Sequence, residues 1–307
     1  MTAGPDGPLL SVIVVSYNMA RELPRTIRSL SPQLQQGVAA EDYEIIVVDN
    51  GSSVPPTLEE VRSWATNGRL VVVGDDAQPS PVPAINAALA EAQGELVGVF
   101  IDGARIASPG VLSGALDAAK LQPSPAIGVL SFHLGPEVQS RSTQNGYDQD
   151  AEDRLLASVR WEEDPYRLFD IAVFADSSAS GWFSTPAETN ALFLEREKWI
   201  ELGGFDPAFK SPGGGLANLD LWARLCGDPG VRPCLLLGEA TFHQVHGGVA
   251  TNAATSPWEH FHDEYVSIRG KAYQRPNVSP WLIGRFQDRH LRTVGDSIVG
   301  WADRMRS

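Results

Sequence analysis

Short apolar runs alternate with amphipathic stretches along the first half of the chain. The run at residues 9–16 is unbroken and ends in Ser-Tyr-Asn, which is typical of a strand buried on both faces. Residues 20–36 then carry Leu and Ile at the three- and four-residue spacing of one helix face. The β-branched run at 43–49 predicts a second strand, and it stops at the turn cluster Asn50-Gly51-Ser52-Ser53.

The same alternation continues to about residue 134. The pattern predicts helices near 56–67, over 83–93 and after Ser108-Pro109, and strands over 69–74, 95–101 and 125–134. Strand and helix thus alternate at least four times with short connections. This predicts an α/β fold with a mainly parallel, Rossmann-like sheet and helices on both faces.

Residues 135–187 break this rhythm and are rich in Asp and Glu. We interpret them as a solvated helical excursion, and the functional alternative is a mobile wall of an acceptor site. Regular patterns return after Glu188, and the last fifty residues are predicted to form helices with exposed aromatic side chains. The elements predicted in between are a short strand to Leu194, helices near 195–202 and 218–226, and a strand over 232–237.

Composition and charge limit the class of protein. Of the 307 residues, 43% are hydrophobic and 20% are charged, as in an ordinary globular protein. The 24 Lys and Arg against 38 Asp and Glu give a net charge of −14, which disfavours nucleic acid or an anionic membrane surface as a partner. An acidic surface also repels anionic ligands, so a phosphate site here needs local compensation by Arg, Lys, His or a metal.

Two further features concern the cellular compartment. The longest apolar runs are well short of the roughly 18 residues of a membrane span, so no transmembrane segment is expected. The two cysteines, Cys226 and Cys234, are interpreted as reduced packing residues. Together these features predict a cytoplasmic location.

Polar residues follow three of the predicted strands. Asn18 follows the first strand, Asp49 ends the second, and Asp102 follows the strand over 95–101. Ligands bind outside the carboxyl ends of the strands in parallel sheets of this kind. We therefore expect the three side chains to line one binding crevice.

Five segments occur in a characteristic order and spacing. They are Val12-Ile13-Val14-Val15-Ser16-Tyr17-Asn18, Ile46-Val47-Val48-Asp49-Asn50-Gly51-Ser52, residues 86–94 with Asn86 and Gly94, Phe100-Ile101-Asp102 with Pro109 seven residues later, and Gly203-Gly204-Phe205-Asp206. Through them the chain resembles the family-2 inverting glycosyltransferases of the GT-A fold, over about residues 12–249. The resemblance implies transfer of a sugar from a nucleotide diphosphate donor to an acceptor hydroxyl.

The resemblance also implies binding roles and domain limits. Ser16, Asn18, Asp49 and Asp102 are expected to bind the donor. Asp49 would accept a hydrogen bond from a base N–H, which suits uracil or thymine and favours a UDP- or dTDP-sugar. The implied division is a GT-A domain over 1–250, with a nucleotide-binding half over 9–104 and an acceptor half over 105–250, and a helical C-terminal extension over 251–307.

Acids that the resemblance leads us to expect are missing. The second Asp of a D-x-D motif would stand at position 104, which is Ala104, and the next position, often a third acid, is Arg105. The Glu-Asp pair that usually supplies the base maps onto Ala217-Asn218. We therefore predict that Asp220 is the general base. It lies in the first turn of a predicted helix that follows the loop Gly213-Gly214-Gly215, and these glycines let the backbone approach a ligand closely. The alternative is that Asp220 only stabilises that helix N-terminus.

Two ways of neutralising the diphosphate remain. In one, Arg105 serves as a fixed cation, because a guanidinium matches phosphate geometry. In the other, Asp102 and His246, together with His243, hold a divalent cation. Nucleotide-bound Mg²⁺ needs only one or two protein ligands, and imidazole favours Mn²⁺ over Mg²⁺. We prefer the divalent cation to Arg105 alone, because the two His residues beside Gly247-Gly248 have no evident packing role.

Other functions need different sequence features. A nucleotidylyltransferase or a dinucleotide-dependent oxidoreductase would need a glycine-rich loop after the first strand, where the chain reads Ser-Tyr-Asn-Met-Ala. A catalytically inactive nucleotide-sugar-binding or scaffold module of the same fold stays open, because Ala104 and Asn218 replace acids. The expected partners are a nucleotide-diphospho-sugar and an acceptor hydroxyl.

Overall fold

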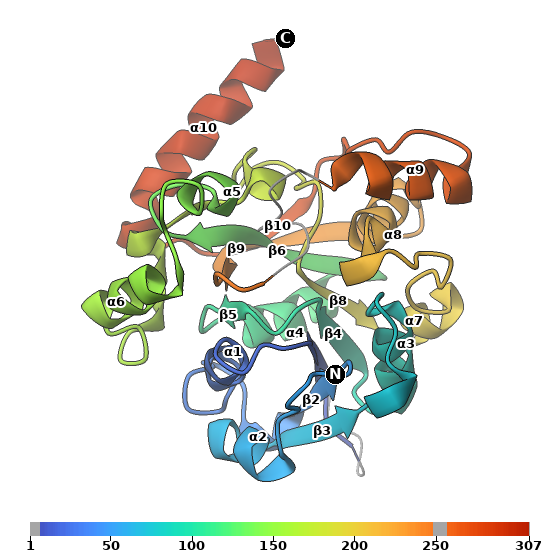
Figure 1. Ribbon diagram of the computed structural model, residues 1–307. Coiled ribbons are helices and arrows are strands. Elements are labelled where there is room, and N and C mark those ends of the chain that lie inside the picture. The colour runs from blue at the N-terminus through green and yellow to red at the C-terminus, as the bar shows by residue number, and fades with distance from the viewer. Residues whose placement is uncertain (1–6, 248–256, 307) are drawn as a thin grey trace.

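The strands form one continuous sheet in a computed structural model that describes residues 7–247 and 257–306. They are β1 Leu10–Ser16, β2 Tyr43–Asp49, β3 Gly68–Val72, β4 Leu96–Phe100, β5 Arg105–Ala107, β6 Pro125–Leu134, β7 Ala172–Phe174, β8 Ala191–Glu195, β9 Arg232–His243 and β10 Trp281–Gly284. Their order is β10-β9-β6-β8-β4-β1-β2-β3, with β5 beside β9 and β7 beside β6 (Figure 1).

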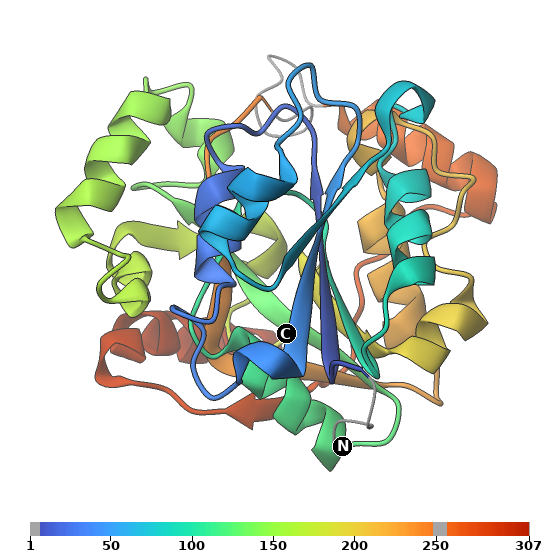
Figure 2. The same cartoon turned by 90° about the horizontal axis from the view of Figure 1, so that it is seen from below.

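Helices cover both faces of this sheet, as predicted (Figure 2). The α-helices are α1 Leu23–Ser29, α2 Leu58–Trp64, α3 Val82–Glu91, α4 Val111–Leu121, α5 Gln139–Ser142, α6 Gln149–Val159, α7 Arg196–Leu202, α8 Ala217–Gly227, α9 Trp258–Arg269 and α10 Leu291–Arg306. Val12 and Val14 of β1 pack in one core cluster with α1, α2 and α4, whereas Ile13 and Val15 pack in a second cluster with α3, α7 and α8. The division follows from the two-residue period of a strand.

Short 3₁₀ helices occupy several of the connections. They are η1 Ala40–Asp42, η2 Gly74–Asp76, η3 Pro165–Ile171, η4 Asp176–Ser178, η5 Pro212–Gly214 and η6 Asp288–His290. The segment η5 contains Gly213 and Gly214 at φ of 70° and 87°, a conformation that glycine adopts without steric cost. The glycines predicted to form a loop before α8 therefore make its tight turn.

Strands β4, β1, β2 and β3 are parallel neighbours, so their carboxyl ends meet at one edge of the sheet. Ser16 pairs with Asp49 at the ends of β1 and β2, and Val14 pairs with Phe100 at the end of β4. Asp102 follows Phe100 at the same edge. The sequence prediction that these strand ends converge is confirmed.

The other half of the sheet is mixed. Strand β8 runs antiparallel to both β4 and β6, while β9 runs parallel to β6 and β10. The short strand β5 is antiparallel to β9 and places Arg105 opposite His243. This pairing brings the loop after β4 to the end of β9, which is far away in the sequence.

Two of the predicted elements differ clearly in length from the observed ones. The helix expected over 20–36 is only α1, which has Pro24 in its first turn and Leu30 as its C-cap. It stops there because Pro32 disfavours helical geometry at Ser31 and lacks the N–H that a longer helix needs. Strand β9 is longer than the predicted 232–237 and extends to His243.

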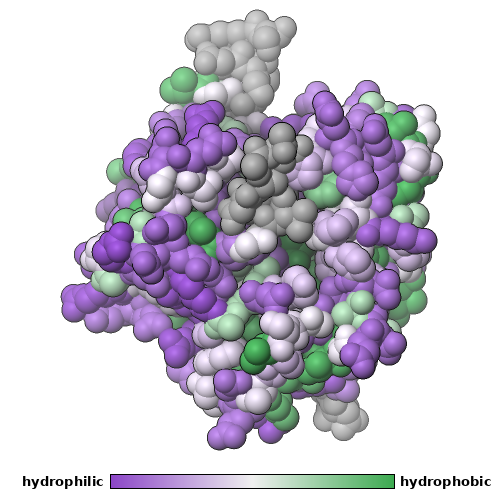
Figure 3. All heavy atoms as spheres, in the orientation of Figure 1, coloured by the Kyte–Doolittle hydropathy of each residue, from purple (hydrophilic) through white to green (hydrophobic). Residues whose placement is uncertain are grey.

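The acidic segment 135–187 is not simply a solvated excursion. It contains α5, α6, η3 and β7, and β7 joins the sheet beside β6. Hydrophilic side chains dominate the surface over α6 (Figure 3). Glu152 of α6, however, is fully buried, so its inner face carries a carboxylate into the protein.

The C-terminal region contains the expected helices, α9 and α10, and α10 extends away from the body of the molecule (Figure 1). Exposed Trp258, Trp281 and Trp301 agree with the prediction for this region. Strand β10 was not predicted, and it continues the sheet. The proposed border between 250 and 251 lies outside the described residues, so the domain division stays a prediction. Within 7–247 and 257–306, no helix is both long enough and apolar enough to cross a membrane.

Candidate active site

The ends of β1 and β2 are joined by hydrogen bonds in the turn that follows Asp49. Asp49 is fully buried, and its carboxylate accepts from the backbone N–H of Ser52 at 2.9 Å and from the Ser52 hydroxyl. Asn18 has a φ of 52°, and its Oδ1 accepts from the backbone N–H of Ser53 at 2.9 Å. The backbone carbonyl of Ser16 accepts from Asn50 N–H at 2.8 Å. These predicted donor-binding residues therefore shape one edge, and their contact with a nucleotide stays a prediction.

Asp102 and Arg105 form an ion pair beside that edge. Arg105 Nε donates to Asp102 Oδ2 at 2.8 Å, and the N–H of Ala104 donates to Oδ1 at 3.0 Å. Arg105 also donates to the Ser131 hydroxyl at 2.9 Å and is only 8% exposed. The two residues predicted to face the diphosphate are thus held together, with Arg105 supplying a cation within the site.

Position 104 lies in the core. Ala104 is fully buried and belongs to the cluster that packs under α1 and α4. Its carbonyl oxygen accepts from the backbone N–H of Gln244 at 2.9 Å, which ties the loop after β4 to the segment after β9. Ala104 therefore fills a packing position where an acid was expected, and its backbone bond holds the segment that carries His243 and His246.

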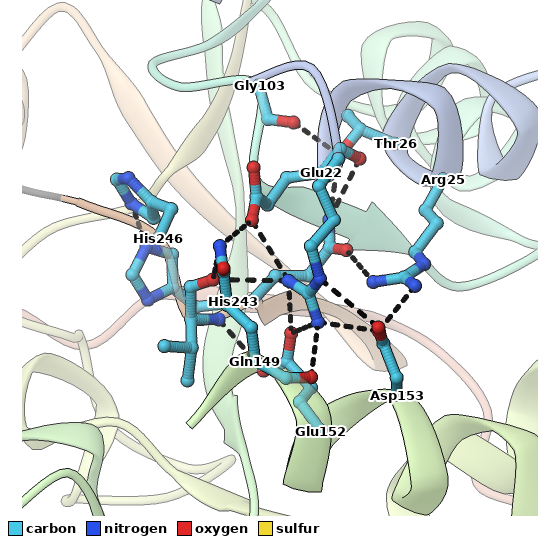
Figure 4. A network of polar contacts seen from close by, with 12 residues as sticks. Glu22, Arg25, Thr26, Gly103, Gln149, Glu152, Asp153, His243 and His246 are labelled. Atoms are coloured by element: carbon cyan, nitrogen blue, oxygen red, sulfur yellow. Dashed lines mark hydrogen bonds and ion pairs between the residues drawn. The ribbon is translucent and has the colours of Figure 1, made fainter. Parts of the chain in front are cut away.

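His243 and His246 meet Asp102 at this point. The Nε2 atoms of the two imidazoles are 3.0 Å apart, and one ligand atom from each of the three side chains lies within 4.8 Å of the others. Figure 4 shows the two His side chains next to each other at the end of β9. His and Asp with this separation are suitable ligands for Mn²⁺ or Mg²⁺.

The hydrogen bonds of His243 fit a metal ligand. Gln139 Nε2 donates to the Gln244 carbonyl, so its Oε1 faces His243 Nδ1 and accepts the proton there. That tautomer leaves the lone pair on His243 Nε2, the atom that faces His246. Metal-binding His residues usually donate their second N–H to an oxygen in this way. Gln139 was not identified from the sequence.

Both imidazoles are held neutral. Burial lowers the pKa of His243 far below its usual value, with the charge of Arg105 adding to the effect. Burial also lowers the pKa of His246, and Arg105 acts in the same direction, while Asp102 opposes it. Neutral imidazole is the form that binds metals. The lowered pKa values therefore leave both imidazoles unprotonated and able to bind a metal ion.

A charged network fixes the segment that carries His246 (Figure 4). The N–H of Val245 donates to Glu152 Oε2 at 2.8 Å, and Arg21 donates to the Val245 carbonyl at 3.2 Å. Arg21 also pairs with Glu22, Glu152 and Asp153, and Arg25 pairs with Asp153. Burial raises the pKa of Glu152 to about 7. Helices α1 and α6 thereby hold the backbone next to His246 from two sides.

Asp220 lies in a different environment. It is 1% exposed, and its oxygens accept from Arg269 Nε at 2.6 Å, from Arg269 Nη2 at 2.7 Å and from Arg224 Nε at 2.8 Å. Arg269 also pairs with Asp206 at 2.7 Å. These contacts connect α8 to α9, and none of the contacts of the described residues joins Asp220 to Asp102. Asp220 as the general base stays a prediction, and its ion pairs with Arg224 and Arg269 do not support that role.

The order and direction of the strands define a fold of the GT-A type. The crystal structure of S. aureus TarS 1-349 in complex with UDP-GlcNAc has a TM-score of 0.52, with 16% identity over 84% of this chain and 65% of that chain. The same protein in complex with UDP has a TM-score of 0.50 and 14% identity, over 84% and 70% of the two chains. These likenesses support the fold.

Sequence comparison gives the family. The pattern described as Glycosyl transferase family 2 matches residues 11–178. Two proteins named validoxylamine A glucosyltransferase, from Streptomyces hygroscopicus subsp. jinggangensis (strain 5008) and subsp. limoneus, are each 30% identical over 228 residues, or 71% of this chain. The chain belongs to glycosyl transferase family 2. It spans about half the length of these two relatives, 51% and 48%.

Proposed function

We propose that the chain is an inverting glycosyltransferase that moves a sugar from a UDP-sugar to an acceptor hydroxyl. The observation that carries the proposal is the Asp102–His243–His246 group at the carboxyl edge of β4, the edge where open α/β sheets bind their ligands. Family membership supports the reaction class. The glucosyl relatives and the UDP-bound fold neighbours make UDP-glucose the first donor to test, with dTDP-glucose beside it.

The strand-end residues would receive the nucleotide. Asp49 keeps its carboxylate fixed by Ser52, which prepares an acceptor for the N–H of a uracil or thymine base. Ser16 and Asn18 set the backbone on either side of that carboxylate. Asp102 and Arg105 would lie beside the ribose and the diphosphate.

Asp102, His243 and His246 would hold a divalent cation. When bound, such an ion offsets the negative charge that grows on the leaving diphosphate. Arg105 contributes a fixed positive charge to the same place, and Gln139 keeps the His243 lone pair directed at the site. In the alternative, Arg105 alone neutralises the diphosphate. Chelators would then leave the activity unchanged.

The reaction itself is a single displacement. The acceptor oxygen forms a bond to the anomeric carbon while the bond from that carbon to the β-phosphate oxygen breaks, so the configuration inverts. One general base takes the acceptor proton, and no covalent intermediate is needed. The acceptor is defined by its hydroxyl, and a cytoplasmic location stays a prediction.

A ligand panel tests the proposal. We expect UDP-glucose and UDP to raise the melting temperature in the presence of Mn²⁺ and to have little effect in EDTA, because a ligand of the native state stabilises it. UDP release from UDP-glucose should then be measurable. A chain that binds none of these nucleotides with Mn²⁺ contradicts the proposal.

Ala104 and Asn218 favour one alternative, a catalytically inactive nucleotide-sugar-binding module. Such a module would bind UDP-glucose with Mn²⁺ and release no UDP. The same panel therefore separates an enzyme from a binding protein.

A further inference from the structure

A second carboxylate lies beside Asp102, and sequence patterns alone did not single it out. Glu188 stands just before β8, and β8 is the antiparallel neighbour of β4. The backbone N–H of Ile101 donates to the carbonyl of Asn190 at 3.3 Å. This bond joins the segment before β8 to the residue that precedes Asp102, so the chain path fixes Glu188 close to the proposed donor site.

Asn218 of α8 orients this carboxylate. Its Nδ2 donates to Glu188 Oε2 at 2.7 Å and to the Thr189 carbonyl at 3.0 Å. Asn218 stands where the family resemblance places the Asp of the Glu-Asp pair. An amide cannot take a proton from a hydroxyl, but it can hold a carboxylate that does. Position 218 lacks the expected carboxylate, but its hydrogen-bond partner Glu188 supplies one.

The segment that carries Glu188 is rigid. The Thr189 hydroxyl donates to the Val129 carbonyl at 3.1 Å, and Val129 N–H donates back to it at 3.1 Å. Tyr273 donates to the Ala187 carbonyl at 3.0 Å from the far side. A proton acceptor has to be held within hydrogen-bond reach of the reacting hydroxyl, and these contacts fix the backbone on both sides of Glu188.

Charged and polar groups surround Glu188. Burial raises the pKa of its carboxyl, and the negative charge of Asp102 adds to the effect, while Asn218, Arg105 and Asn190 oppose it. Burial also raises the pKa of Tyr273, and the charge of Glu188 adds to that effect. Glu188 also keeps partial exposure, which Asp220 lacks.

We propose that Glu188 is the general base of this chain and that Asn218 positions it; this rests on the proposed transferase function. The Glu188 carboxylate takes the proton of the acceptor hydroxyl as the oxygen bonds to the anomeric carbon. The bond from that carbon to the β-phosphate oxygen breaks, and its electron pair leaves with UDP. The proton passes from Glu188 to solvent, so the step needs no other reactant.

Paired variants test the assignment. Glu188→Gln keeps the size of the side chain, so UDP release from UDP-glucose should fall roughly 10²–10⁴-fold. The Kd of UDP with Mn²⁺, measured by calorimetry, should stay within about twofold, because the base does not hold the nucleotide. Glu197→Gln, the same change at an exposed position of α7, is the matched control, and its turnover should stay within about threefold of wild type.

Two further readouts separate a base from a structural residue. In Glu188→Gln/Asn218→Asp the carboxylate moves to the other side of the hydrogen bond, and at least about tenfold of the lost turnover should return. In the wild type, kcat should fall on the acid side as Glu188 protonates, and this limb should be absent in Glu188→Gln. A merely structural role would change the melting temperature and leave the pH profile intact.

The outcomes distinguish the two proposals. Turnover that survives Glu188→Gln, or a pH profile that is unchanged in that variant, overturns Glu188 as the base and leaves the proposed transferase function intact. A wild-type chain that does not bind UDP overturns the proposed function. A chain that binds UDP-glucose and never releases UDP overturns both.

Discussion

The two halves of the sheet use their polar residues differently. In the parallel half, Asp49 and Asn18 bond to the turn at Ser52 and Ser53, within 35 positions of each other along the chain. In the mixed half, the groups with unusual pKa values come from separate segments: His243 ends β9, His246 follows it, and Glu188 precedes β8. The first half therefore provides a shaped edge that ends at Asp102, and the second provides the other groups that we propose for metal binding and proton transfer.

The largest effect on activity should come from removal of the divalent cation. EDTA should lower UDP release from UDP-glucose by roughly 10³-fold or more, and Mn²⁺ should restore it, because a bound cation contributes several kcal/mol to stabilising the leaving charge. His246→Ala should weaken UDP binding only when Mn²⁺ is present. Full activity in EDTA together with an inactive Arg105→Ala variant would assign the neutralising role to Arg105.

The next largest effect should be the loss of folding stability when Asp220 is replaced. Asp220→Asn should lower the free energy of unfolding by about 3 kcal/mol, because it leaves Arg269 and Arg224 without their buried partner. Both arginines keep some contact with water, which places the value at the low end of the usual range. Urea denaturation with an unchanged m-value measures it. Asp206→Ala, which removes only the partly exposed partner of Arg269, should cost less.

The fold of the parallel half was largely predictable because its signals are local. Strands β1, β2 and β4 are mostly apolar runs, and their ends carry the residues that lie at one edge. The length of α1 was overestimated because the spacing of its apolar positions outweighed Pro32. Strand β10 was not predicted, since four residues of mostly exposed strand give too short a pattern.

The site in the mixed half was predictable only in part. Asp102 and Arg105 were identified from motif position, and His243 and His246 from their place after a predicted strand and before two glycines. The structure brings all four together. Glu188 and Gln139 have no motif. Their positions depend on β8 pairing with β4 and on α5 packing near the end of β9, and neither arrangement is encoded by residues near them in the sequence.

Asp49 tests the nucleotide half. Asp49→Ala should weaken UDP binding by about 1–3 kcal/mol, the loss of a hydrogen bond to a buried partner. Calorimetry in Mn²⁺ measures the change. Ser52→Ala is the control, because it removes the hydroxyl that holds the Asp49 carboxylate and leaves the carboxylate in place. Equal affinity of Asp49→Ala and wild type for UDP would remove Asp49 from the site.

The smallest effect should be the pH dependence of the network around Glu152. Its pKa of about 7 is raised by burial above the unfolded value, so its contribution to stability is present below about pH 4.5 and is lost as the pH rises through 7. Between pH 6 and 8, wild type should therefore lose on the order of 1 kcal/mol relative to Glu152→Gln. Urea denaturation of both proteins across this range measures it. Parallel pH curves would show that Arg21 keeps Glu152 ionised throughout.

We expect the imidazoles of His243 and His246 and the carboxylate of Asp102 to hold the divalent cation at the donor diphosphate. Pulsed electron paramagnetic resonance of Mn²⁺ bound with UDP can detect this coordination, because a coordinating His nitrogen modulates the manganese signal. We expect nitrogen coupling in the wild type, reduced coupling in His246→Ala and in His243→Ala, and unchanged coupling in Asp220→Asn. A Mn²⁺–UDP complex bound to the wild type without nitrogen coupling would show that the imidazoles do not hold the cation.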